Sequence, residues 1–215
     1  MTFAKEAWPF VLPFWVIAAA LAALRQPWWA LALAFVGFLV LLFFRDPTRR
    51  FDGPAGTVIA PADGVVTRID VVEDADLGPG KFHRVVTFLS ALDVHVQRAP
   101  ADGEVIAARY TSGRKVAAFR PDADQVNEKH LSVLRLPNGD TIGVCQIAGL
   151  IARRVVCYLR LGDRVTRGQL IGLIKFGSRV DLMVPESYQV LVAKGQRLRN
   201  GETPVALAPA APPAG

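Results

Sequence analysis

The sequence predicts a mainly β protein, a compact β-barrel or β-sandwich domain preceded by an N-terminal hydrophobic α-helical hairpin. Two apolar runs without a charge, residues 8–24 and 28–44, predict the hairpin. Short Val-, Ile- and Leu-rich segments bounded by Gly, Pro, Asp and Asn follow, and turn signals at this spacing are typical of barrels and sandwiches. We expect a membrane-associated hairpin with its linker (1–50), a β-rich domain (51–200) and a disordered tail (201–215).

The hairpin accounts for a composition that is too apolar for an ordinary soluble domain. Hydrophobic residues make up 52% of the 215-residue chain, and its mean hydropathy is +0.30. Each run would give about 25 Å of helix, close to the thickness of a hydrocarbon core. A buried hairpin of a soluble protein is the alternative, but neither run has a polar face. Whether the hairpin spans the bilayer or enters one leaflet stays open.

The charges around the hairpin predict its orientation. Lys5 precedes it and Arg45, Arg49 and Arg50 follow it, so the positive-inside rule places both ends and the β domain on the cytoplasmic face of the cell (inner) membrane. The net charge of +6 suits either nucleic acid or anionic lipid. The apolar runs favour anionic membrane lipid as the partner, and no basic run with interleaved aromatic residues indicates nucleic acid.

The β domain is expected to consist of short strands, with residues 122–129 as a charged loop or short helix. The expected strands are residues 57–59, 64–72, 84–89, 94–98, 103–111, 131–136, 141–147, 155–159, 169–174 and 187–190. After Gly201 the composition becomes mostly Ala and Pro, which predicts disorder.

Cys145 and Cys157 have no CxxC spacing, so we interpret them as reduced, packed residues, and no motif implies a metal cofactor.

The candidate for chemistry is the Gly177-Ser178 pair at the end of an apolar strand pattern. Gly177 has no Cβ, so its carbonyl can be approached closely by the hydroxyl of Ser178. A serine that attacks its own peptide bond needs this access. A serine at a strand end is otherwise an ordinary structural residue, so the pair needs support from other motifs.

That support comes from a set of segments in a fixed order. They are Ala-Pro-Ala-Asp-Gly at 60–64, Phe-Leu-Ser-Ala-Leu-Asp-Val-His at 88–95, Asn-Glu-Lys at 127–129, Gln-Ile-Ala-Gly-Leu-Ile-Ala-Arg-Arg at 146–154, and the segment 162–178 that ends in Lys-Phe-Gly-Ser. With these motifs, residues 45–195 resemble the phosphatidylserine decarboxylase proenzymes of the short bacterial and archaeal type.

The resemblance implies a pyruvoyl enzyme that makes its own cofactor. Ser178 would attack the Gly177 carbonyl, and elimination and hydrolysis would leave a covalent pyruvoyl group at the start of a new α chain. The β chain would end at Gly177, and the two chains would stay associated. A Schiff base between the ketone and the phosphatidylserine amine would accept electrons as CO₂ leaves, giving phosphatidylethanolamine.

The resemblance also implies helper residues. Asp63 matches the family's Asp in the Pro-Ala-Asp-Gly segment, and His95 matches the first of two histidines found in longer members. Arg98 stands where those members have the second histidine. Either His95 assists both the self-cleavage by Ser178 and the reaction of the substrate, or self-cleavage uses another base. Arg153 and Arg154 would bind the substrate phosphate, or they are solvated surface residues.

A second function from another class is also consistent with the sequence. Residues 162–172 resemble the strand-turn-strand of biotinyl and lipoyl carrier domains and of membrane-anchored adaptors, which gives the predicted domain barrel-sandwich-hybrid-like strands. The chain would then be a non-enzymatic membrane-anchored adaptor. Cleavage at Gly177 distinguishes the two functions. A pyruvoyl decarboxylase of a soluble amino acid is disfavoured by the hydrophobic hairpin.

Overall fold

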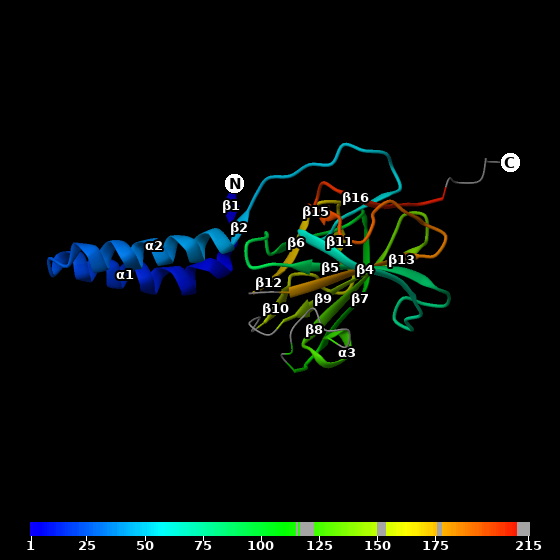
Figure 1. The fold of residues 1–215 in the computed structure, drawn as a ribbon. Helices are drawn as coiled ribbons and strands as arrows, with labels where there is room; N and C mark the ends of the chain where they lie inside the picture. Colours follow the sequence, from blue (N-terminus) through cyan, green and yellow to red (C-terminus); the bar gives the residue numbers. More distant parts are fainter. Residues whose placement is uncertain (115, 117–122, 150–153, 176–177, 210–215) are drawn as a thin grey trace. The chain divides into compact units, whose positions relative to one another are not determined.

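The structure, a computed structural model, describes residues 1–114, 116, 123–149, 154–175 and 178–209. The chain divides into two compact units, Met1–Thr48 and Arg49–Gly215. The first is helical and the second is built from strands (Figure 1), so the predicted fold class is confirmed.

The first unit is a helical hairpin. A 3₁₀ turn, η1 (Lys5–Ala7), leads into α1 (Trp8–Ala23), and α2 (Pro27–Phe43) returns after a turn in which Arg25 has a φ of 59°. Short strands β1 (Thr2–Phe3) and β2 (Arg45–Asp46) pair antiparallel and close the unit. Both helices match the two predicted apolar runs.

Close contact between the helices depends on small residues. A Cβ on Gly37 would lie 2.7 Å from Trp15 Nε1, so only glycine lets the indole reach the α2 backbone. Away from this seam, large apolar side chains are exposed, including Trp28 at 81% and Val16 at 66%. Such a continuous apolar surface is typical of a membrane contact. Within the described residues, Lys5–Ala23 is the helix long and apolar enough to cross a membrane, although this alone is weak evidence.

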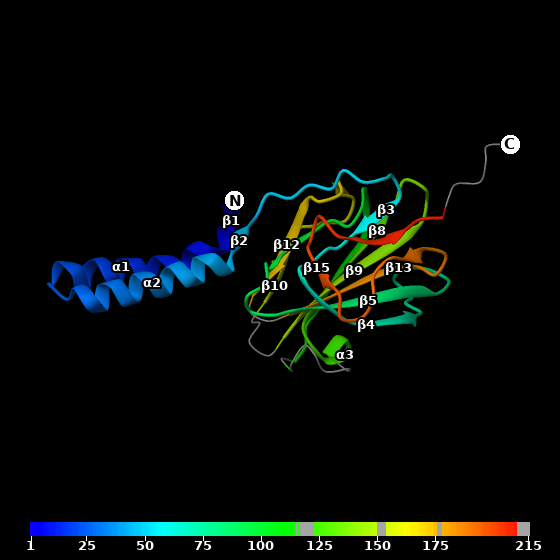
Figure 2. The same cartoon turned by 45° about the horizontal axis from the view of Figure 1, so that its top comes forward.

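Among its described residues, the second unit contains three sheets and one short helix, α3 (Ala123–Val126) (Figure 2). The largest is a curled eight-stranded sheet with the order β11 (Arg164–Val165), β7 (Gly103–Thr111), β8 (Lys129–Arg135), β9 (Thr141–Ala148), β13 (Ser178–Pro185), β5 (Phe82–Leu89), β4 (Gly64–Val72) and β15 (Arg197–Leu198). The two smaller sheets have the orders β10 (Val155–Cys157), β12 (Leu170–Ile174), β6 (Val96–Arg98), and β14 (Gln189–Val190), β16 (Pro204–Leu207), β3 (Thr57–Ile59).

The core forms on both faces of the large sheet, because successive side chains of a strand point to opposite faces. On β13, Val180 and Leu182 belong to the main core cluster that the three sheets enclose, whereas Met183 belongs to a second cluster. That second cluster includes Phe82 and Ile147. The whole of β13 up to Val184 is buried, which is why this strand has no exposed polar face.

The described part of the tail corrects the prediction of disorder from residue 201. Pro204–Leu207 forms β16 between β3 and β14, and Val205 and Ala206 are fully buried. The Ala- and Pro-rich composition hid a strand whose two small apolar side chains fit the core beside Val58. Residues 210–215 lie outside the described part of the chain.

Candidate active site

Ser178 is the first residue of β13, the strand that lies between β5 and β9. It pairs with Leu89 of β5 on one side and with Ala148 of β9 on the other. The side chain is completely buried, and within the described residues its Oγ has no hydrogen-bond partner. Gly177, the other half of the predicted cleavage site, lies outside the described residues.

His95 lies beside the segment that leads to Ser178. The His95 carbonyl accepts a hydrogen bond of 3.2 Å from Ile174 N, and Ile174 is the last residue of β12. The imidazole is 1% exposed, and its Nδ1 is 2.8 Å from the Asp93 carbonyl oxygen. Because a carbonyl only accepts hydrogen bonds, Nδ1 carries the proton, and in the neutral ring Nε2 carries the lone pair. His95 therefore has the tautomer of a base that acts through Nε2.

The turn before His95 is held by Asp93, to which the sequence assigned no role. Its Oδ2 accepts hydrogen bonds from Ser90 N at 2.8 Å and Ser90 Oγ at 2.7 Å, and Arg197 Nη1 donates to its Oδ1 at 2.6 Å. Burial by itself raises the pKa of Asp93, but these hydrogen bonds outweigh it and lower the pKa. Asp93 thus stays ionised and fixes the backbone that carries His95.

Two buried amides support His95 from within the core. Gln97 Nε2 donates to the His95 carbonyl at 2.8 Å, and Gln146 Nε2 donates to Gln97 Oε1 at 2.8 Å. Both glutamines are almost completely buried. A Cβ on Gly172 would lie 3.0 Å from Gln146 Nε2 and 2.2 Å from the Val156 carbonyl oxygen, so a larger residue at position 172 would displace this pair.

Asp63 is buried in a separate set of contacts. Arg49 forms a bidentate ion pair with its carboxylate, and Asn200 N donates to Oδ1 at 2.8 Å. Within the described part of the chain, no hydrogen bond joins Asp63 directly to Ser178 or His95. The connection is indirect, because Asn200 Nδ2 also donates to the Val96 carbonyl at 2.8 Å, next to His95. No local motif in the sequence indicates Arg49 and Asn200 as partners of Asp63.

Asn127 connects the α3 region with the strand beside Ser178. Its Nδ2 donates to the carbonyls of Ala148 and Val116, both at 2.7 Å, and Val116 N donates to its Oδ1 at 2.9 Å. Ala148 is the residue paired with Ser178. The Asn-Glu-Lys motif that supported the family resemblance therefore fixes the end of β9 at the candidate site.

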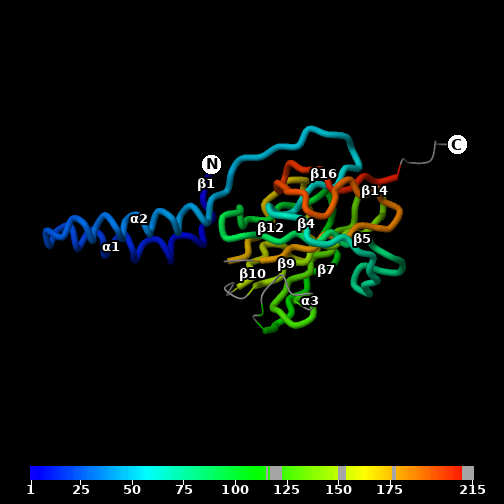
Figure 3. Tube along the Cα trace, viewed as in Figure 1, coloured from blue at the N-terminus to red at the C-terminus, as the bar shows by residue number. Residues whose placement is uncertain are grey.

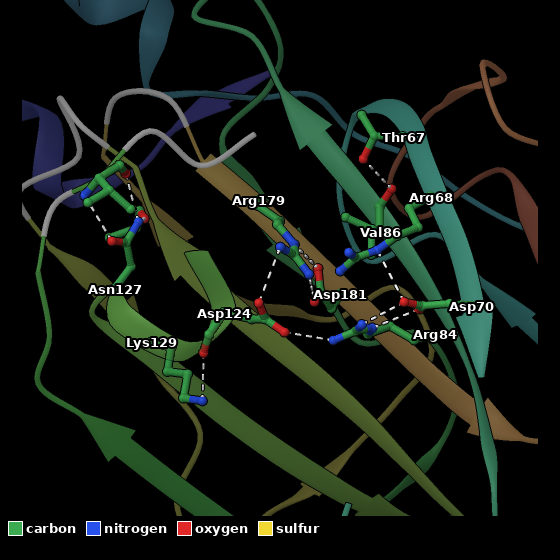
Figure 4. Close-up of polar contacts among 12 residues, drawn as sticks. Thr67, Arg68, Asp70, Arg84, Val86, Asp124, Asn127, Lys129, Arg179 and Asp181 are labelled. Atoms are coloured by element: carbon green, nitrogen blue, oxygen red, sulfur yellow. Dashed lines mark hydrogen bonds and ion pairs between the residues drawn. The ribbon is translucent and has the colours of Figure 1, made fainter. Parts of the chain in front are cut away.

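A buried ion-pair network covers the opposite face of the same strands (Figure 4). Arg179, the residue after Ser178, is 3% exposed and donates to Asp181 through Nε at 2.7 Å and Nη2 at 2.6 Å. Asp124 of α3 lies between Arg179 and Arg84, at 3.7 and 2.7 Å. The network thereby joins α3 to the strand that begins with Ser178.

The network shifts the pKa values of its carboxyl groups in opposite directions. The hydrogen bond from Arg84 lowers the pKa of Asp70, which lies at the exposed margin. Burial raises the pKa of Asp181, and the ion pair with Arg179 counteracts this only in part. Removal of Arg179 would therefore leave Asp181 buried without its hydrogen-bonding partner.

Of the two arginines predicted to bind phosphate, Arg154 belongs to the described residues. Arg154 is exposed, and its carbonyl accepts a hydrogen bond of 3.3 Å from Lys175 N, close to the end of β12. Arg153 lies outside the described residues. Arg98, which stands where longer family members have histidine, donates from Nη1 to the Gly168 carbonyl at 2.8 Å.

Cys145 and Cys157 are unbridged and packed, as predicted, and burial raises the pKa of both thiols.

Comparison with known proteins gives one consistent result. The family model for phosphatidylserine decarboxylase matches residues 36–206. A phosphatidylserine decarboxylase proenzyme of Granulibacter bethesdensis is 45% identical over 92% of this chain and 84% of its own length. Proteins of the same name from Nitrosomonas eutropha (38% identity, 94% of both chains) and Nocardia farcinica (44% identity, 92% of this chain and 86% of its own length) are also similar.

Proposed function

The chain belongs to the phosphatidylserine decarboxylase family, and from this membership we propose how its own residues produce the activity. It is a decarboxylase proenzyme of phospholipid biosynthesis that converts phosphatidylserine to phosphatidylethanolamine and CO₂. The alternative of a non-enzymatic membrane-anchored adaptor is not supported, since the similar proteins are named as decarboxylase proenzymes.

The proposed first step is cleavage between Gly177 and Ser178. Ser178 Oγ attacks the Gly177 carbonyl carbon, and the peptide C–N bond breaks as the ester C–O bond forms. Loss of the Ser178 α-proton then expels the Gly177 carboxylate and leaves dehydroalanine. Hydrolysis releases ammonia and gives the pyruvoyl group. The products are a β chain that ends at Gly177 and an α chain that begins with the former Ser178.

The observation that carries this proposal is the buried hydroxyl of Ser178, for which the described residues provide no hydrogen-bond partner. Leaving a buried polar group without a partner costs about 1–3 kcal/mol, so such groups are rare unless they have a function. The position therefore fits the precursor of a pyruvoyl group. Once formed, that group supplies a carbonyl that binds the substrate amine and accepts the electrons left by departing CO₂.

We assign His95 to proton transfer, because its tautomer places the lone pair on Nε2 and its position is fixed by Asp93 and Gln97. Asp63 acts through the backbone around Val96, since both of its oxygens are bound by Arg49 and one also by Asn200.

Arg153 and Arg154 bind the substrate phosphate by charge-assisted hydrogen bonds. The hairpin holds the enzyme at the cytoplasmic face of the cell membrane, where phosphatidylserine is available.

Intact mass spectrometry of the purified protein tests the proposed cleavage. We expect two fragments divided after Gly177, with a pyruvoyl-blocked α chain, and a single uncleaved chain for Ser178→Ala. Ser132→Ala is the matched control, because Ser132 is also a buried strand serine but bonds to His130 and Cys157. A single intact chain in the unmodified protein, after incubation with membranes at neutral pH, would contradict the proposal.

The variant His95→Gln tests the assignment of the proton-transfer residue. We expect the cleaved enzyme to decarboxylate phosphatidylserine about 10²–10⁴-fold more slowly, the usual contribution of a positioned general acid or base. The extent of cleavage in the same sample shows whether His95 also assists Ser178. Undiminished decarboxylation would exclude His95 from the reaction.

A further inference from the structure

A row of three residues in the large sheet faces the main core at the start of β13. Ala148 N donates to the Glu128 carbonyl, so these residues lie opposite each other, and Ala148 pairs with Ser178 on its other side. Ala148 belongs to the main core cluster, as do Val180 and Leu182 of β13. Because side chains alternate along a strand and residues opposite each other share a face, Glu128, Ala148 and Ser178 all point to the main core.

A second row comes from the small sheet of β10, β12 and β6, which lies beside β8 and β9 (Figure 3). Val155 pairs with Ile174, and Ile174 N donates to the His95 carbonyl, which continues the pairing of Leu173 with Val96. Val155 and Ile174 belong to the main core cluster. His95 lies opposite Ile174, so its imidazole is on the same face. The two rows therefore face each other.

Two hydrogen bonds hold the two sheets together around these rows. Glu128 Oε1 accepts a hydrogen bond of 3.0 Å from Val155 N, which joins the rows directly. One layer further into the core, Gln146 Nε2 donates to Gln97 Oε1 at 2.8 Å. The position of Glu128 relative to the candidate active site is thus fixed from both sheets.

The Glu128 carboxylate has one oxygen that this arrangement does not use. The residue is 8% exposed, and among the residues that the structure describes Oε2 has neither a hydrogen bond nor an ion pair. Taking a carboxylate out of water is costly unless a cation or hydrogen-bond donors compensate its charge. The single bond to Val155 N needs only an acceptor oxygen, which an uncharged amide also offers. A structural role alone therefore does not account for the charge.

The carboxylate is also close to the position where the chemistry would occur. Strands are spaced about 4.8 Å apart, so the backbones of Glu128 and Ser178 are about 10 Å apart, with Ala148 between them. The side chain of Ala148 is a single methyl group. A small cationic group between the two rows would have Glu128 on one side and Ser178 on the other.

We propose that Glu128 binds the ammonium group of the phospholipid substrate. The inference deepens the proposed function and rests on it, since the nitrogen of phosphatidylserine must reach the group formed at Ser178. An ammonium donates charge-assisted hydrogen bonds, for which Oε2 is the matching acceptor. Arg154, which directly precedes Val155, lies next to this position and suits the phosphate. The two opposite charges of the headgroup would then each meet a complementary side chain.

The variant Glu128→Gln tests the assignment, because its amide oxygen can still accept the bond from Val155 N while the negative charge is lost. Isothermal titration calorimetry measures lipid binding to the cleaved full-length enzyme after borohydride has reduced the pyruvoyl carbonyl, so that only non-covalent binding remains. The ligands are dispersed short-chain phosphatidylserine and short-chain phosphatidylglycerol, which has no ammonium. Glu104→Gln is the matched control, since Glu104 is exposed and lies opposite Arg135 at the other end of β8.

We expect Glu128→Gln to bind phosphatidylserine about 10–100-fold more weakly than the unmodified enzyme, the usual effect of losing a hydrogen bond to a charged group. Its affinity for phosphatidylglycerol should be unchanged, and Glu104→Gln should bind both lipids normally. Unchanged binding of phosphatidylserine to Glu128→Gln, or an equal loss for both lipids, would overturn the assignment. So would a lack of phosphatidylserine binding to the reduced, unmodified enzyme.

Self-cleavage and decarboxylation by the unreduced enzymes separate this inference from the proposed function. We expect Glu128→Gln to cleave like the unmodified chain and to show a kcat/KM for phosphatidylserine that is lower by the same factor as its affinity. An uncleaved unmodified chain would count against the proposed function itself. A cleaved and fully active Glu128→Gln would refute only the role of Glu128. A Glu128→Gln chain that does not cleave would assign the carboxylate to self-cleavage and would likewise overturn its role in substrate binding.

Discussion

At the scale of single residues, the most demanding feature is the charge buried behind Ser178. Arg179 and Asp181 are 3% and 2% exposed, so both have lost their hydration. Two hydrogen bonds between them, together with Asp124 and Arg84, offset this cost. A buried pair adds little net stability compared with apolar residues, but losing one partner is expensive. Arg179 is therefore a positioning residue, which fixes the strand whose first residue is Ser178.

We expect Arg179→Ala to lower the free energy of unfolding by about 3–5 kcal/mol, because Asp181 would be left as an uncompensated buried charge. The double variant Arg179→Met with Asp181→Leu should recover most of this loss, since it removes both charges and keeps the volume. Urea unfolding measures both. In the control, Arg109→Ala removes an ion pair with Asp76 in which Arg109 is 65% exposed, and the change should be within about 1 kcal/mol. A single variant as stable as the unmodified protein would contradict the assignment.

The sequence points to some residues of the candidate site and gives no signal for others, for a physical reason. Ser178 and His95 stand in local motifs, so the sequence alone could propose them. The partners of Asp63 are distant in the chain, Arg49 by 14 residues and Asn200 by 137, and only the fold brings them together. For Arg179 and Asp181 a local signal does exist, because an Arg-x-Asp pair within an apolar strand places two opposite charges on one face.

At the scale of elements, β16 shows how a small strand can complete a core. It pairs with β3 and β14, and Leu191 N donates to the Val205 carbonyl at 2.8 Å. Val205 and Ala206 are fully buried although the surrounding sequence is rich in Ala and Pro. Composition alone predicted disorder here, because it does not show that a four-residue segment meets two strand edges.

Truncation distinguishes a structural β16 from a dispensable tail. A chain that ends at Glu202 loses the buried Val205 and the pairing with β3, which should lower the stability by at least about 3 kcal/mol. For a chain of this size, this corresponds to a melting temperature about 6–12 °C lower. A chain that ends at Pro209 keeps β16 whole and should melt like the full-length protein. Equal melting temperatures for the two truncated chains would show that β16 is not needed.

The strand β13 was also absent from the predicted strands, although the fold class was correct. Polar and apolar residues alternate only from Arg179 to Leu182, and Met183 and Val184 break the alternation, since the strand is buried on both faces from Ser178 to Val184. Val180 and Leu182 face the main core, whereas Met183 packs in the second cluster and the Arg179–Asp181 pair forms the ion-pair network with Asp124 of α3 (Figure 4). Turns and half-buried strands have a recognisable local pattern in the sequence. A central strand with buried charges does not, because the residues that compensate those charges lie on neighbouring elements that only the fold brings together.

At the scale of the whole molecule, the proposed cleavage divides the strands between two interwoven chains. β13 would start the α chain, yet it lies between β9 and β5 of the β chain. β15 pairs with β4, and β16 pairs with β3, so the α chain supplies β13 and β15 of the eight-stranded sheet and two of the three strands in the sheet that contains β3. Separation of the chains would expose a large part of the main core, and for this reason we expect them to stay associated.

This arrangement makes a prediction about how cleavage changes unfolding. If the chains separate only on unfolding, the cleaved protein unfolds to two molecules, whereas Ser178→Ala unfolds to one. Mass action then requires the urea midpoint of the cleaved protein to rise with protein concentration, and that of Ser178→Ala to stay constant. A tenfold higher concentration should stabilise the cleaved form by about 1.4 kcal/mol. Size-exclusion chromatography in native buffer should show both fragments in one peak. A midpoint independent of concentration in the cleaved protein would mean that the fragments do not separate on unfolding, contrary to a purely non-covalent association through β13, β15 and β16.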